Sequence, residues 1–129
     1  MSDGGDRFVP RPRSTGDARG STDRRNLADE LARVERRLAE RVIGTPRTEF
    51  SDGAASYDAA SMVVVRLFGL LERPDASGLR ERLTPDEFAA LRTIRNIVAH
   101  GGYATMNDEV FWLTATRDLP DIVARLRTA

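Results

Sequence analysis

The chain has 129 residues, the length of one ordinary domain, and its 40% hydrophobic content is enough to build a core. It has no cysteine, which excludes disulfides, thiol catalysis and cysteine metal sites, and its single histidine disfavours a transition-metal site unless two copies each supply one. The 20 acidic and 20 basic residues give a net charge of zero, so no long-range field draws the whole protein to nucleic acid.

Every basic residue is an arginine and none is a lysine. Arginine can grip phosphate with two parallel hydrogen bonds, but a coding bias toward GC-rich codons explains the composition more simply. Any contact with nucleic acid therefore has to come from a local cluster of arginines. The N-terminus lacks the apolar run of a signal peptide and no stretch is long enough to span a membrane, so we expect a cytoplasmic protein with no membrane partner.

Residues 1–21 are rich in glycine, proline and charge, and we predict that they form a disordered tail. Residues 22–129 then make one helical domain. Its first helix is predicted from Asp23 to Ile43, because apolar residues recur at spacings of four and three along one face. That face consists of Leu27, Leu31, Val34, Leu38 and Val42.

A second helix is predicted from Ser51 or Asp52 to about Arg73, with residues 75–83 as a loop or a short turn. Its C-terminal half is apolar nearly all round, which indicates the most buried helix of the domain. The β-branched run Val63–Val65 is compatible with a strand, but the length of the segment and its alanine-rich beginning favour a helix.

The third helix has the clearest start signal in the chain. Thr84 is a suitable N-cap, Pro85 fits the first helical position and Glu87 completes a capping box. The helix is predicted to end at Ala99 or His100, because two glycines follow.

Asn107 is predicted to cap a fourth helix that carries Trp112 and continues toward the end of the chain. Pro120 either kinks this helix or divides it, with Asp118 as a fresh cap. No segment has a convincing strand pattern. The sequence therefore predicts an all-α bundle of four or five helices.

The end of the third helix holds the residues that point to chemistry, in the segment from Arg95 to Tyr103. His100 is the only histidine, and histidine both gives and takes a proton near neutral pH. Arginine offers a permanently charged, forked grip on phosphate. The combination of Arg95, Asn96 and His100 therefore suggests binding or cleavage of a phosphodiester.

At about 100° per residue, apolar side chains of this helix form a stripe that is predicted to face the core. The stripe consists of Ala90, Leu91, Ile94, Ile97 and Val98. The opposite side carries a polar ladder of Arg92, Asn96 and His100, each four residues from the next. Arg95 lies at the edge of the ladder, about 140° around the axis from His100, so one helix holds the pair poorly around one phosphate.

Two features bear on that geometry. Gly101 and Gly102 allow the chain to re-aim the imidazole, and the small Ala89 and Ala99 on the polar face allow a second copy of the helix to approach closely. A two-fold homodimer would place two arginines and two histidines in one shared cleft. Helix propensity alone is also a sufficient explanation for the alanines.

Each candidate residue also has a purely structural explanation. His100 can interact with the last carbonyls of its helix and the negative end of the dipole. Arg95 can form a salt bridge with an acidic residue two turns back or with another helix, Asn96 can bond to nearby backbone, and Tyr103 can pack on the bundle. For Trp112 we favour core packing.

With these residues in place, the chain resembles the HEPN superfamily, specifically its HepT-like branch of small helical proteins. Members carry arginine, four to six residues, histidine, any residue and tyrosine at the end of a long helix, and the segment from Arg95 to His100 fits the first part. Residues 106–112 are similar to the branch's usual Val-Asp-x-x-x-Val-Trp, and residues 118–120 to its later Asp-Leu-Pro. The chain departs from the pattern in having two glycines before Tyr103.

The resemblance implies a HEPN-like bundle and metal-independent RNA cleavage by a homodimer without a cofactor. Arg95 and His100 would be catalytic, and Asn96 and Arg92 would support them. Often such a protein is the toxin of a toxin–antitoxin pair, silenced by a minimal nucleotidyltransferase that in some pairs attaches AMP to the motif tyrosine. Here that tyrosine is Tyr103, which we expect to be exposed near the mouth of the cleft. The alternative is a non-catalytic helical module that binds a nucleotidyltransferase or a nucleotide.

Overall fold

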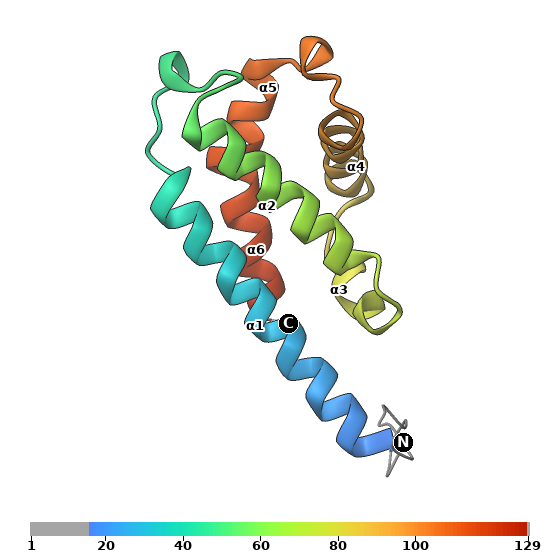
Figure 1. The fold of residues 1–129 in the computed structure, drawn as a ribbon. Coiled ribbons are helices and arrows are strands. Elements are labelled where there is room, and N and C mark those ends of the chain that lie inside the picture. Colours follow the sequence, from blue (N-terminus) through green and yellow to red (C-terminus); the bar gives the residue numbers. More distant parts are fainter. Residues whose placement is uncertain (1–15, 129) are drawn as a thin grey trace, which may run out of the picture.

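The structure is a computed structural model that describes residues 16–128. These residues form an all-α bundle without a strand, as predicted (Figure 1). The helices are α1 (Gly16–Arg41), α2 (Ala55–Leu71), α3 (Ser77–Arg80), α4 (Pro85–Ala99), α5 (Asp108–Leu113) and α6 (Leu119–Arg127). Short 3-10 turns connect them at Arg47–Glu49, Pro74–Ala76 and Tyr103–Thr105.

The first helix starts earlier than the sequence pattern predicts. α1 begins at Gly16 rather than Asp23, so the part of the predicted tail from residue 16 to residue 21 is helical, and residues 1–15 lie outside the described residues. The stretch from residue 16 to residue 26 contains no large apolar side chain. Periodicity of apolar residues therefore gives no sign of a helix there.

α2 is the central helix of the bundle. It packs against α1 on one side and against α4 on the other (Figure 1). Val63 and Val64 are fully buried within it, which confirms the helix over the strand. The five predicted apolar residues from Leu27 to Val42 are all buried, and each such side chain stabilises the fold by roughly 1.5–3 kcal/mol.

An aromatic cluster fills the core where α2 and α5 begin. Phe50, Tyr57 and Phe111 are fully buried, with ring centroids 5.0 to 5.1 Å apart. The Tyr57 hydroxyl donates a hydrogen bond of 2.9 Å to Oδ1 of Asp108. Burial, reinforced by this hydrogen bond to a carboxylate, raises the pKa of Tyr57 well above its ordinary value.

Tyr57→Phe is expected to lower the free energy of unfolding by about 1.5–3 kcal/mol near neutral pH, because the Asp108 carboxylate loses a hydrogen-bond donor. The folded state holds the Tyr57 proton more tightly than the unfolded state, so this contribution is complete below the unfolded-state pKa of about 10 and declines above it. Urea unfolding near pH 7 and near pH 11 should therefore show a smaller alkaline loss of stability in Tyr57→Phe than in the wild type. Tyr103→Phe is the matched control, and equal losses in the two variants would contradict the assignment.

The C-terminal helical segment is continuous, so of the two predicted outcomes Pro120 does not divide it, and Asp118 does not cap a new helix. α5 passes into α6 through a π-helical turn at Thr114–Asp118, where the amide of Leu119 donates to the carbonyl of Thr114 five residues back. Asp118 has helical backbone angles and its side chain caps nothing. The extra residue in the turn accommodates the missing amide of Pro120 without ending the helix.

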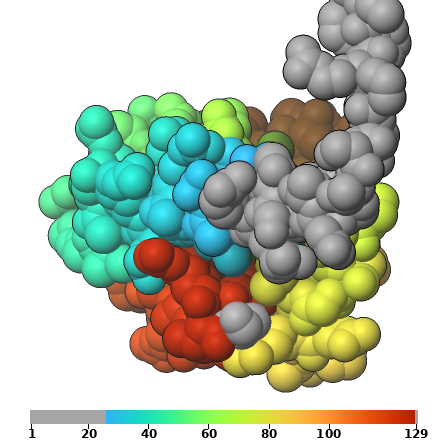
Figure 2. Space-filling view, turned by 90° about the horizontal axis from the view of Figure 1, so that it is seen from below, coloured from blue at the N-terminus to red at the C-terminus, as the bar shows by residue number. Residues whose placement is uncertain are grey.

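Arg125 of α6 forms an ion pair with Glu87 in the first turn of α4. Its guanidinium donates to both carboxylate oxygens of Glu87, at 2.8 and 3.0 Å, and to Asp121 at 2.8 Å. This forked pairing lowers the pKa of Glu87. Figure 2 shows the end of α6 beside α1 and beside the segment around α3, and there Arg127 forms an ion pair with Glu35 of α1. These contacts fix the position of the helix that carries the candidate site.

Candidate functional site

α4 begins and ends as the sequence predicts. The Glu87 amide donates to the Thr84 hydroxyl at 3.1 Å, and the Thr84 amide donates to the Glu87 carboxylate at 2.9 Å, which completes the capping box. At the other end Gly101 has a φ of 67°, and the Gly102 amide donates at 2.9 Å to the helix carbonyl five residues back. This left-handed termination makes His100 the C-cap of α4.

Gly101→Ala is expected to destabilise the fold by about 1–2 kcal/mol, because a side chain is strained at a φ of 67° even though the new Cβ would touch nothing. Gly102→Ala is the matched control. Its φ is −88° and the nearest atom to a new Cβ is 3.5 Å away, so we expect a change within about 0.5 kcal/mol. Urea unfolding compares the two variants, and equal effects would show that the left-handed residue does not govern how α4 ends.

The side of α4 that packs on the bundle is narrower than predicted. Leu91 and Ile94 are buried, whereas Ile97 and Val98 are half-buried. Ala90 is exposed, which corrects its assignment to the core stripe. The reason is that α4 lies at the edge of the bundle and packs mainly on α2 (Figure 1). Much of the surface of α4 is therefore open.

The predicted polar ladder lies on this open surface. Arg92, Asn96 and His100 are exposed, and so are Ala89 and Ala99 beside them. Among the described side chains, those of residues 26–128, His100 forms no hydrogen bond or ion pair, and it does not bond to the last carbonyls of its own helix. Beyond its first turn α4 carries two arginines and no carboxylate. The exposed imidazole and the positive charge of Arg92 make this face suitable for an anion.

Arg95 is turned toward α2. Its guanidinium carbon lies 4.6 Å from the centroid of the Phe68 ring, and its Nη2 lies 3.5 Å from Oε2 of Glu72. Its Nε is buried and has no hydrogen-bond partner. The structural alternative of an ion pair with another helix is therefore observed, with Glu72 of α2 as the partner.

The contacts that hold Arg95 are weak. Stacking on a ring contributes about 0.5–2 kcal/mol, and a pair as open as this one, in which the Glu72 side chain is 55% exposed, contributes about 1 kcal/mol or less. Within the described part of the chain, no hydrogen bond joins Arg95 to His100. One protomer therefore does not bring the two predicted catalytic side chains together, as their positions around the helix imply.

Phe68 and Glu72 are functional candidates that sequence analysis missed. They lie one turn apart on α2 and contact Arg95 only because α2 and α4 pack together. The sequence pattern predicts that Phe68 is an ordinary core residue and that Glu72 is a charged residue at the end of a helix. Nothing in the spacing along the chain indicates that either one contacts the motif arginine.

Tyr103 is half-buried, which corrects the expectation of an exposed tyrosine at the mouth of a cleft. Its ring centroid is 6.0 Å from that of Tyr57, because the 3-10 turn after α4 folds it back onto the bundle. Trp112 packs against the core, as predicted, and its indole Nε1 donates to the Thr45 carbonyl at 2.8 Å. Both aromatic residues therefore contribute to packing.

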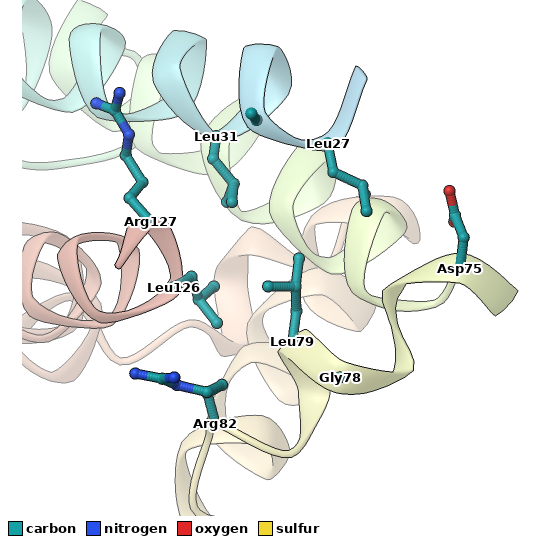
Figure 3. Close-up of a pocket in the computed structure, with 9 residues that line it drawn as sticks. Leu27, Leu31, Asp75, Gly78, Leu79, Arg82, Leu126 and Arg127 are labelled. Atoms are coloured by element: carbon teal, nitrogen blue, oxygen red, sulfur yellow. The ribbon is translucent and has the colours of Figure 1, made fainter. Parts of the chain in front are cut away.

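A large hollow of about 530 Å³ lies away from α4, between α1, α3 and α6 (Figure 3). Leucine side chains from all three helices point into it. Its charged neighbours already have partners: Asp75 pairs with Arg73, Arg82 donates to a backbone carbonyl, and Arg127 pairs with Glu35. Leucine is the most frequent residue in its described lining, which contains no histidine.

Comparison with known proteins identifies no relative: no family model, no curated protein and no solved structure matches the chain. Among residues 16–128, no helix has the length and apolar character needed to cross a membrane. The described side chains, those of residues 26–128, include no group of three or more histidine, cysteine or acidic residues placed to hold a metal ion.

Proposed function

We propose that the protein is a metal-independent endoribonuclease that works as a homodimer, in keeping with its resemblance to the HepT-like HEPN proteins. The observation that carries the proposal is the exposed face of α4. It presents the only histidine of the chain, free of partners in the described structure, on one surface with Arg92 and Asn96. The weakly held Arg95 lies at the edge of that face.

In the proposed reaction the ribose 2′-hydroxyl attacks the adjacent phosphorus. His100 takes the proton of that hydroxyl, the bond from phosphorus to the 5′-oxygen breaks, and the partner's His100 protonates the departing oxygen. The products are a 2′,3′-cyclic phosphate and a 5′-hydroxyl. Arg95 stabilises the charge on the non-bridging oxygens, and Asn96 donates a hydrogen bond to the same phosphate.

The reorientation of Arg95 costs little on this scheme. Its present contacts contribute on the order of 1–3 kcal/mol together. A charge-assisted, two-point hydrogen bond to phosphate is stronger than the 3.5 Å approach to Glu72 that it replaces. The buried Nε without a partner also gains one when the guanidinium moves. Arg95 is therefore available to an anionic substrate.

A dimer supplies what one protomer lacks. Arg95 and His100 point to different sides of α4, so a site with both groups around one phosphate needs a second copy of the helix. The exposed Ala89 and Ala99 allow two copies of α4 to approach closely around a two-fold axis. The partner nucleotidyltransferase implied by the resemblance is part of the proposal. An AMP group on Tyr103 requires its ring to leave the contact with Tyr57.

The direct test is incubation of the purified protein with single-stranded RNA in the presence of EDTA. We expect cleavage that the chelator does not reduce and products that carry a cyclic phosphate. Cleavage that needs an added divalent ion would contradict the scheme. No cleavage under any condition would favour the non-catalytic binding module, for which the present engagement of Arg95 with Phe68 and Glu72 is the supporting observation.

A further inference from the structure

A second surface, separate from the exposed face of α4, gathers arginine side chains. Two hollows of about 280 and 410 Å³ lie between α1 and α2, and Arg37 lines both of them. Arg33, Arg37 and Arg41 follow one another at four-residue intervals along α1, and Arg66 faces them from α2. We call these four residues and the space between them the arginine groove.

Most of the charge in the arginine groove is not neutralised. Arg33 pairs with Glu30 at 2.6 Å. Arg37, Arg41 and Arg66 are exposed and form no ion pair or hydrogen bond in the described part of the chain. Glu30 and Glu40 are the carboxylates that line the two hollows. Four guanidinium groups against two carboxylates make this a local positive surface on a chain of zero net charge.

The shape of the arginine groove suits an extended ligand. Its two hollows share Arg37, and the small Ala55 and Ala59 of α2 line the second hollow together with Arg37 and Arg41. Successive arginines four residues apart on α1 are displaced by about 6 Å along the helix axis. Unpaired arginines in a row repel one another, and a chain of phosphates relieves that repulsion at several points at once.

We propose that the arginine groove binds the phosphodiester backbone of single-stranded RNA next to the bond that is cut. This inference rests on the proposed function and extends it from the scissile phosphate to the flanking strand. α2 packs against α1 and against α4, so the axes of α1 and α4 are about two helix spacings apart, on the order of 16–20 Å. The exposed carboxylates Asp58 of α2 and Glu72 at its C-cap do not line either hollow.

The test measures RNA binding without cleavage. The full chain carrying His100→Ala is titrated into a labelled single-stranded RNA oligonucleotide in EDTA at several salt concentrations, with and without Arg37→Gln and Arg66→Gln. We expect the groove variant to bind roughly tenfold more weakly or worse. We also expect the slope of log affinity against log salt to fall by about 0.7 for each lost phosphate contact, about 1.4 for two. The same substitutions should weaken the binding of a single-stranded DNA oligonucleotide of the same sequence by the same factor, since the groove contacts phosphate.

The control removes the same charge elsewhere. Arg36→Gln with Arg117→Gln changes two exposed arginines outside the groove, one of them on the same turn of α1 as Arg37. Equal losses in the two double variants would overturn the inference, because they would show a general charge effect. Unchanged RNA affinity in the groove variant would also overturn the inference. An acidic protein surface would then be the better candidate partner of the groove. If the wild type cuts no RNA but its RNA binding depends on the groove arginines, the inference about the groove holds and the proposed nuclease activity is refuted.

Discussion

His100→Ala is expected to reduce the rate of RNA cleavage by a factor of about 10²–10⁴, the usual contribution of a positioned general acid or base. Arg95→Ala is expected to reduce the cleavage rate by a factor of about 10²–10³, because it removes the group that stabilises the developing charge on phosphate. The His100 side chain is exposed and bonds to nothing in the described structure, so its removal should leave the fold intact. Cleavage of RNA in EDTA measures both variants against the wild type.

Arg117→Ala controls for the loss of a positive charge, because Arg117 is exposed and lies on another helical segment. Circular dichroism should show the same helical content in all three variants. Wild-type cleavage by His100→Ala would mean that the motif is structural, and it would leave the binding module as the better explanation.

Ala89→Glu is expected to convert the protein from a dimer to a monomer and to abolish cleavage. Ala89 is exposed on the face of α4 that we propose to meet its own copy, so the substitution brings two like charges together in a closed interface. Light scattering at micromolar concentration should give about twice the 14.3 kDa chain mass for the wild type and about that mass for the variant.

Ala90→Glu is the matched control, because Ala90 is also exposed but points about 100° away around the same helix. The two substitutions add the same charge at the same depth in α4 and should affect its helicity equally. A wild type that is monomeric at this concentration would refute the proposal that two protomers together form the site. Loss of the dimer in both variants would show that the interface lies elsewhere.

The sequence by itself determined the elements whose signals are local. The apolar residues of α1 recur with the helical period, and all five are buried as that period requires. The capping box at Thr84 and the left-handed Gly101 set the two ends of α4, because each depends on hydrogen bonds within a few residues. The exposure of Arg92, Asn96 and His100 also follows from their angles around one helix.

Only the tertiary structure decided which side chains from different helices meet. The sequence places Arg95 at the edge of the polar ladder, but its contact with Phe68 and Glu72 depends on how α4 packs against α2. The arginine groove likewise exists because Arg66 of α2 comes beside the arginines of α1. Tyr103 also finds its partner only in the folded bundle, where its ring contacts the buried ring of Tyr57 on α2. Periodicity along a helix fixes the direction of a side chain, whereas the packing of helices fixes its partner.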